Sequence, residues 1–174
     1  SSIPLVALAQ PVLDALSEKL HESSSMAVLE GDEIVYVARS KTTRRLMSVD
    51  LNVGSRLPAY CTSLGRVLLA ARPPEELKQY LARVHPVRHT ARTITSREQL
   101  RTLVEAVRAE GYSVVDEELE IGLRSIAVPV LDARGHVTAA LNASTQASRL
   151  PLVEFRQTFL PALRKAAAEL DVHD

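Results

Sequence analysis

The stretch at residues 56–70 reads RLPAYCTSLGRVLLA and takes the chain from an extended segment into a helix. Pro58 turns the chain, because its ring fixes φ and removes the backbone N–H. Thr62 or Ser63 can cap the helix that follows, and apolar residues then recur at helical spacing on one face: Leu64, Val67, Leu68 and Ala71. A helix start presents unpaired N–H groups and the positive end of the helix dipole, which favour an anion. The stretch therefore predicts either a cradle for the carboxylate of a small acid or an ordinary capped helix in which Gly65 permits close packing.

Amphipathic helices and alternating strands surround this stretch on both sides. Further helices are expected at residues 3–22, 74–83, 97–110 and 152–170, and strands at 26–30, 33–39, 44–51, 112–115, 125–131 and 137–144. Pro11 predicts a kink or a fresh start in the first helix, and Pro129 predicts an edge position or a bulge in its strand. Thr95–Glu98 is a capping box, and Gly111 suits a left-handed C-terminal cap. Short turns between strands indicate an antiparallel sheet, so the order of elements predicts a single α+β domain.

Composition narrows the possible partners. The 174 residues carry 21 Lys and Arg against 21 Asp and Glu, without the basic excess of a nucleic-acid-binding domain. Aromatic residues make up 3%, too few for stacking single-stranded bases. The single cysteine, Cys61, cannot form an internal disulfide or a cysteine-based zinc site, which favours a reducing cytoplasm. Apolar runs fall short of the roughly 20 residues of a membrane helix, so no membrane partner is expected.

Four groups of residues carry possible chemistry. Cys61 stands near a helix start, which lowers a thiol pKa, but no histidine motif accompanies it, and a buried small residue is the preferred interpretation. The segment 85–89 spaces two histidines as a helix would for a metal, yet an intervening proline favours a loop, and we expect no metal site. The acidic run 116–120 is typical of a solvated turn. Asn142 and Ser144 point to the same side of a strand, and they become ligand donors if that side faces the 56–70 helix.

Several segments spaced along the chain carry a resemblance to a known family. They are residues 56–70, Ala109–Tyr112, Asp116–Glu118, Gly122–Val130 and Ala140–Ser144. Together they resemble the effector-binding domain of IclR-family bacterial transcription regulators, and the match spans essentially the whole chain. Ala59–Ser63, with Arg45–Ser48 before it, is similar to the branch that controls aromatic-acid catabolism, the protocatechuate and β-ketoadipate regulators.

The resemblance implies a GAF-like fold, in which a curved antiparallel sheet flanked by helices cups a small-molecule pocket. It also implies a full-length protein with an N-terminal winged helix-turn-helix, absent from this chain, that binds promoter DNA. Residues 1–22 are then a linker and first helix, and 23–174 the effector-binding domain. The family's ligand position maps onto the helix start and the facing strands: Ala59, Tyr60, Cys61, Thr62, Ser63, Leu64, Gly65, Ser125, Asn142 and Ser144, with Asp116 or Glu117 at the rim. Family members that take simple acids often have cysteine in place of Ser125 and serine in place of Asn142.

The leading hypothesis is a domain that senses a small carboxylate, an aromatic acid or a ring-cleavage product, without a cofactor. The charge is expected at residues 61–65 and the body of the ligand against Leu46, Met47, Leu64 and Ile126. The expected partners are this effector, further copies of the chain in a dimer or tetramer, and promoter DNA through the missing domain alone. Two alternatives stay open: a small enzyme that uses Cys61 and a carboxylate, and a module that serves oligomerisation alone.

Overall fold

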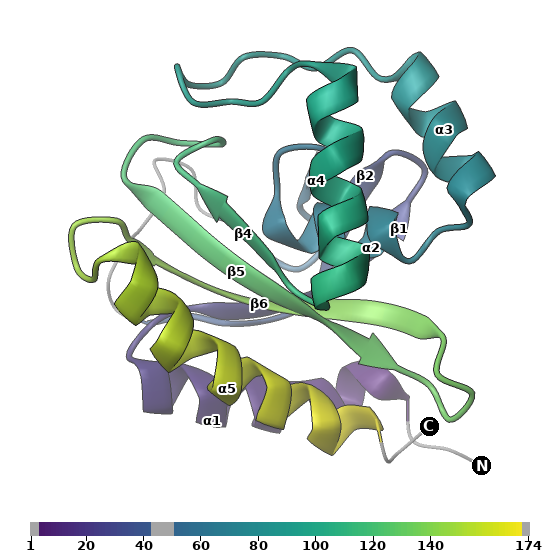
Figure 1. Ribbon diagram of the computed structural model, residues 1–174. Helices are drawn as coiled ribbons and strands as arrows, with labels where there is room; N and C mark the ends of the chain where they lie inside the picture. Colours follow the sequence, from purple (N-terminus) through teal and green to yellow (C-terminus); the bar gives the residue numbers. More distant parts are fainter. Residues whose placement is uncertain (1–3, 43–50, 172–174) are drawn as a thin grey trace.

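The structure is a computed structural model that describes residues 4–42 and 51–171. Within these residues, six antiparallel strands form one sheet in the order β3-β2-β1-β6-β5-β4 (Figure 1). The strands are β1 (Ser24–Glu30), β2 (Glu33–Ser40), β3 (Arg56–Pro58), β4 (Ser113–Asp116), β5 (Leu123–Leu131) and β6 (Val137–Gln146). The helices are α1 (Leu5–Leu20), α2 (Ser63–Ala70), α3 (Pro74–Arg83), α4 (Arg97–Glu110) and α5 (Leu152–Asp171). The predicted α+β class and the curved antiparallel sheet are confirmed.

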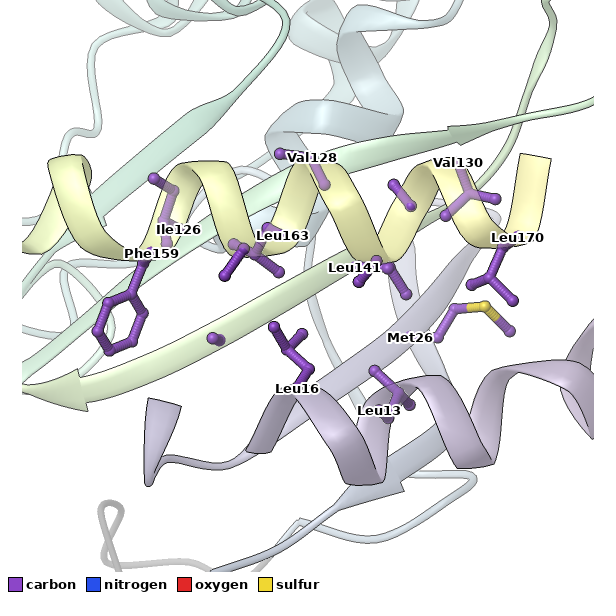
Figure 2. Close-up of a cluster of buried hydrophobic side chains, with 14 of the residues drawn as sticks. Leu13, Leu16, Met26, Ile126, Val128, Val130, Leu141, Phe159, Leu163 and Leu170 are labelled. Atoms are coloured by element: carbon purple, nitrogen blue, oxygen red, sulfur yellow. The ribbon is translucent and has the colours of Figure 1, made fainter. Parts of the chain in front are cut away.

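The sheet separates two hydrophobic cores, because successive side chains of a strand point to opposite faces. On one face α1 and α5 lie side by side, with α1 packed on β1 and β2 and α5 packed on β5 and β6 (Figures 1 and 2). On the other face α2 and α4 pack over a second core that includes Ala27, Ala127 and Ala140, together with residues of α3. The three alanines stand where β1, β5 and β6 cross beneath α2, and their small side chains let that short helix approach the sheet.

The helix boundaries follow local signals in the sequence. Thr62 caps α2, with its side chain accepting a hydrogen bond from Gly65 N, and Gly111 ends α4 in the left-handed conformation at φ 79°. The capping box at Thr95–Glu98 is one residue out of register, because Ser96 is the residue that accepts a bond from the N–H of Gln99. Pro11 lies inside α1, so the fresh start at Pro11 is wrong.

The strand predictions differ from the structure at three places. The run 44–51 lies outside the described residues except for Leu51, which is not in a strand. The extended segment before α2 forms a strand of its own, β3, which pairs with β2 through Ile34 and Leu57. Pro129 has the predicted edge position, since β4 pairs with β5 only as far as Ala127 and Pro129 pairs with β6 alone.

Candidate functional site

The start of α2 is fixed tightly to the segment before it. Thr62 Oγ1 accepts from Gly65 N at 3.1 Å and donates to the carbonyl of Pro58 at 3.0 Å. A Cβ on Gly65 would lie 2.1 Å from the oxygen of Ala59, so the residue must be glycine for the helix to lie this close. All the predicted site residues from Ala59 to Gly65 are buried. Both predicted properties of this helix, a hydroxyl cap and close packing at Gly65, are therefore present.

The predicted residues of β5 and β6 lie under α2. Ser125 Oγ donates to Ser63 Oγ at 2.9 Å, which joins β5 to the first residue of the helix. Ser144 is the cross-strand partner of Ser125, and Asn142 is two residues before it on β6, so both lie on the same face. Asn142 is 7% exposed, its side-chain amide forms no hydrogen bond within the described ranges, and its polar atoms are not fully buried. The structure thus brings Ser63, Ser125, Asn142 and Ser144 together on the α2 face of the sheet.

Ile126 does not belong to this group. It is fully buried among residues of α1 and α5, on the opposite face from Ser125 (Figure 2). Adjacent residues of a strand cannot line the same space, so the prediction that Ile126 contacts the body of the ligand is wrong. Leu46 and Met47 lie outside the described residues.

A bulge in β2 brings to the α2 face a charged residue, Arg39, that was not predicted from the sequence. Met26 pairs with Ala38 while Ala27 pairs with Tyr36, so Val37 is the extra residue of β2. The alternation of β2 reverses there, and Arg39 points to the same face as Tyr36 instead of the face that α1 covers. Its Nη1 donates to Ser25 Oγ at 2.6 Å, and its guanidinium carbon lies 5.4 Å from the centre of the Tyr36 ring.

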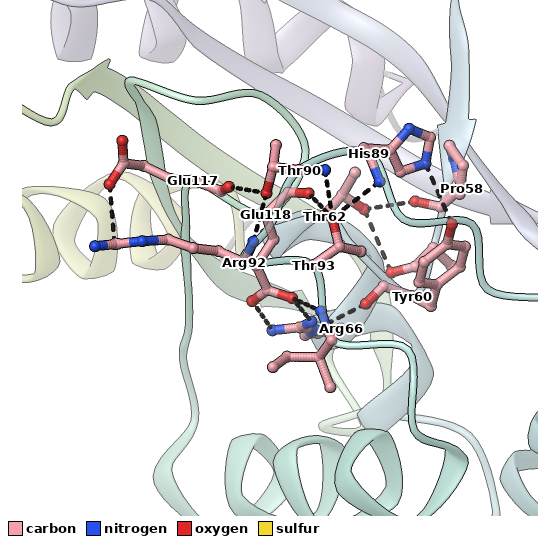
Figure 3. A network of polar contacts seen from close by, with 12 residues as sticks. Pro58, Tyr60, Thr62, Arg66, His89, Thr90, Arg92, Thr93, Glu117 and Glu118 are labelled. Atoms are coloured by element: carbon pink, nitrogen blue, oxygen red, sulfur yellow. Dashed lines mark hydrogen bonds and ion pairs between the residues drawn. The ribbon is translucent and has the colours of Figure 1, made fainter.

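The acidic segment at the end of β4 is largely engaged with arginines, contrary to the solvated turn predicted for it. Glu118 forms a buried two-point ion pair with Arg66 of α2, at 2.6 and 2.8 Å (Figure 3). Asp116 accepts from Arg124 at 2.9 Å, and Glu117 pairs with Arg92 at 2.9 Å. Glu118 was missed because a charge run offers no sign in the sequence that one of its members has a buried partner.

The ion pair belongs to a network that ties the α3–α4 loop (residues 84–96) to the start of α2 (Figure 3). Arg66 Nε donates to the carbonyl of Tyr60 at 2.9 Å, and Glu118 Oε1 accepts from Ile94 N at 3.1 Å. Thr93 Oγ1 donates to the carbonyl of Glu118 at 2.6 Å, and the hydroxyl of Tyr60 accepts from Val87 N at 2.7 Å. The α3–α4 loop therefore holds the segment before α2 in place from outside.

The environment of Cys61 does not favour a nucleophile. Burial raises the pKa of its thiol to about 12, although the nearby Arg66 acts in the opposite direction. At neutral pH the group is therefore the thiol and not the reactive thiolate. His89 Nε2 lies 3.2 Å from the Tyr60 hydroxyl. Among the residues that the structure describes, no group of three or more His, Cys, Asp or Glu side chains is placed to hold a metal ion.

Two further features lie away from the α2 face. An open groove of about 600 Å³ runs between α1 and the end of β2, and it is lined by Asp14, Ser17, Glu18, His21, Ser40, Lys41 and Thr42. None of the predicted site residues that the structure describes lines it. Across residues 4–42 and 51–171, no helix has the length and apolar character needed to cross a membrane.

Proteins of known role are similar in sequence to almost the whole of this chain. The Pca regulon regulatory protein of Pseudomonas putida is 55% identical over 170 residues, which cover 98% of this chain and 58% of that protein. The p-hydroxybenzoate hydroxylase transcriptional activator of Acinetobacter baylyi is 37% identical, over 98% of this chain and 64% of its own length. The chain thus spans about three fifths of the length of these relatives.

Solved structures agree with the fold over nearly the full chain. A putative transcriptional regulator from Rhodococcus sp. RHA1 has a TM-score of 0.94 at 48% identity, covering 99% of this chain and 70% of its own. The inducer-binding domain of the PobR transcription factor from Acinetobacter, a double mutant in complex with 3-hydroxybenzoic acid, has a TM-score of 0.88 at 35% identity. The match covers 97% of this chain and 98% of that domain. Residues 1–172 match the family described as bacterial transcriptional regulator IclR C-terminal. The expected resemblance is confirmed: the chain belongs to the IclR family of transcriptional regulators and corresponds to their C-terminal domain.

Proposed function

We propose that this domain binds a small aromatic acid on the α2 face of its sheet and thereby controls the regulator to which it belongs. The observation that carries the proposal is the Ser63–Ser125 hydrogen bond of 2.9 Å beside the unbonded amide of Asn142. The bond joins the start of α2 to β5, next to Asn142 on β6, and sets polar groups among aliphatic side chains. Ligand sites have this composition, with a few placed polar groups in an apolar surround.

The choice of an aromatic acid rests on the relatives. Two of them carry names that refer to the Pca regulon and to p-hydroxybenzoate hydroxylase, and the PobR inducer-binding domain is a complex with 3-hydroxybenzoic acid. The residues proposed to contact the acid are Ser63, Leu64, Ser125, Asn142 and Ser144, with Tyr60 to Thr62 behind them. Asp116 and Glu117 are proposed to lie at the rim of this site, and their carboxylates pair with Arg92 and Arg124.

Regulation follows from differential affinity. An acid shifts the balance between two arrangements of the protein only if it binds one of them better, and a coupling of about 1–3 kcal/mol is typical. Residues 1–22 are proposed as a linker and first helix and 23–174 as the effector domain. Promoter DNA would be bound by a winged helix-turn-helix before residue 1, in a cytoplasmic homo-oligomer that needs no cofactor.

The two alternative functions find less support in the geometry. An enzyme that uses Cys61 would need a thiolate, which burial opposes by raising the pKa of the thiol to about 12. A module serving oligomerisation alone would not need a polar residue such as Asn142 on the α2 face of the sheet, where it is 7% exposed beside the aliphatic core.

Calorimetric titration of the chain tests the proposal. The acids are 3-hydroxybenzoate, 4-hydroxybenzoate, protocatechuate, β-ketoadipate, pyruvate and glyoxylate. At least one hydroxybenzoate is expected to bind more tightly than pyruvate and glyoxylate, and Asn142→Leu is expected to abolish that binding in a folded chain. Binding of none of the six, or unchanged binding by the Asn142 variant, would refute the proposal.

A further inference from the structure

A row of polar residues crosses three adjacent strands on the α2 face. Arg39 of β2 is the cross-strand partner of Ser25 of β1, and Ser25 is in turn the partner of Asn142 of β6. Directly opposed residues of an antiparallel pair lie about 5 Å apart at Cβ. A cation, a hydroxyl and an amide therefore stand next to one another, and Ser25 and Asn142 are 1% and 7% exposed.

Two side chains in or beside this row have polar ends without hydrogen bonds to any described residue. One is the Asn142 amide. The other is the hydroxyl of Tyr36, a residue 4% exposed whose ring lies against the Arg39 guanidinium. Burial raises the pKa of that hydroxyl to about 12, so it is a neutral donor at physiological pH. Neither end is among the fully buried polar atoms that lack a partner in the described residues, so both keep some solvent access and are available to a polar guest.

The start of α2 is expected to bind a carboxylate more weakly than the row formed by Arg39, Ser25 and Asn142. One of its first amides, Gly65 N, is already bonded to Thr62 Oγ1, and the helix has eight residues. A helix terminus is equivalent to about half a unit charge. A guanidinium carries a full charge and binds a carboxylate through two parallel N–H groups.

We infer that Arg39, positioned by the β2 bulge and by Ser25, is the residue that binds the carboxylate of the effector, with Asn142 beside it. The inference rests on the proposed function and revises the place of the charge within the same site. Three strand spacings, about 14 Å in all, separate Arg39 on β2 from Ala127, which lies in the same row on β5, and Ser125 is two residues further along that strand. The ring of the acid would then point toward the Ser63–Ser125 pair, which would bind its ring hydroxyl.

The test compares an acid with its uncharged amide. 3-Hydroxybenzoate and 3-hydroxybenzamide are titrated into the wild-type chain and into Arg39→Gln, Arg39→Met and Arg39→Lys. Arg39→Gln is expected to weaken acid binding about 10- to 100-fold, the range for a lost hydrogen bond to a charged group. Binding of the amide should change less than about threefold, since its group carries no charge for the cation to attract.

Two further variants separate the loss of a carboxylate contact from damage to the fold. Arg39→Met keeps the aliphatic stem over Tyr36 and should show the same selective loss, and Arg39→Lys, which keeps the charge but not the paired N–H groups, should lie between. Arg56→Gln is the matched control, because Arg56 pairs with Glu30 and Glu33 on the exposed edge of the same sheet. It should bind the acid as the wild type does.

Each other result overturns the inference. Equal losses for acid and amide would mean that Arg39 supports the fold of the site without meeting the charge. Unchanged acid binding in a folded Arg39→Gln chain would place the carboxylate elsewhere, for instance at the start of α2, and leave the proposed function intact. A wild-type chain that binds none of the titrated acids would overturn the proposed function and this inference together.

Discussion

Replacement of Glu118 tests how the α2 segment is held in place. The Arg66 and Glu118 side chains are 2% and 10% exposed, and their two hydrogen bonds measure 2.6 and 2.8 Å. Glu118→Leu leaves the guanidinium of Arg66 buried without its counter-charge, and Arg66→Met does the reverse to the carboxylate. Breaking a buried pair in this way costs about 3–5 kcal/mol. Each single variant therefore loses a large part of the 5–15 kcal/mol that is typical of a domain.

The double variant Arg66→Met/Glu118→Leu leaves no buried charge. It loses the hydrogen bonds to the carbonyl of Tyr60 and from the N–H of Ile94, at about 1 kcal/mol each. Its destabilisation is thus about 2 kcal/mol, against about 6–10 kcal/mol for the sum of the single variants. The coupling between the two positions should exceed about 3 kcal/mol.

Urea unfolding measures the four free energies. With a slope of about 2 kcal/mol per molar urea, each single variant lowers the midpoint by about 1.5–2.5 M and the double variant by about 1 M. Arg56→Gln, which breaks exposed pairs with Glu30 and Glu33, should cost less than about 1 kcal/mol. A double variant as unstable as the sum of the singles, or a Glu118→Leu chain within 1 kcal/mol of wild type, would refute the reasoning.

Three further outcomes follow from local geometry. Gly65→Ala should lower the melting temperature by about 4–10 °C, since a Cβ 2.1 Å from Ala59 O overpacks the α2 contact at about 1–3 kcal/mol; an unchanged temperature contradicts this. At pH 8 iodoacetamide should alkylate Cys61 in urea but not in the native chain, because burial raises its pKa to about 12; mass spectrometry decides. The hydrogen bond from Arg83 lowers the pKa of Asp32 below 3.8, so their pair stabilises the fold above that pH. Asp32→Asn should cost less than about 1 kcal/mol in urea unfolding at pH 7, and the difference from wild type should vanish on acidification; a difference that persists at the lowest pH refutes the assignment.

Most of the architecture could be predicted because its signals are local. The cap at Thr62, the left-handed Gly111 and the periodicity of α3 depend on residues within a few positions of each other. The family resemblance added the curvature of the sheet. The one-residue error at Thr95 arose because Ser96 is an equally good cap, and the choice between them depends on how α4 meets the rest of the domain.

The parts of the site that the sequence did not predict depend on register and on distant partners. Strict alternation in β2 would turn Arg39 away from Tyr36, and only the pairing of Met26 with Ala38 shows the bulge that reverses it. Ile126 was misplaced for a simpler reason, since its alternation with Ser125 was already visible in the sequence. Arg66, the partner of Glu118, is 52 positions earlier in the chain, and no local sequence pattern indicates a pairing over that separation.

A crystal structure of the chain with 3-hydroxybenzoate would show directly where the acid binds. We expect the ring between the start of α2 and strands β5 and β6, within hydrogen-bond distance of Asn142, and the carboxylate paired with the guanidinium of Arg39. Density for the acid in the groove beside Asp14 and Lys41, or on the α1 and α5 side of the sheet, would contradict this account.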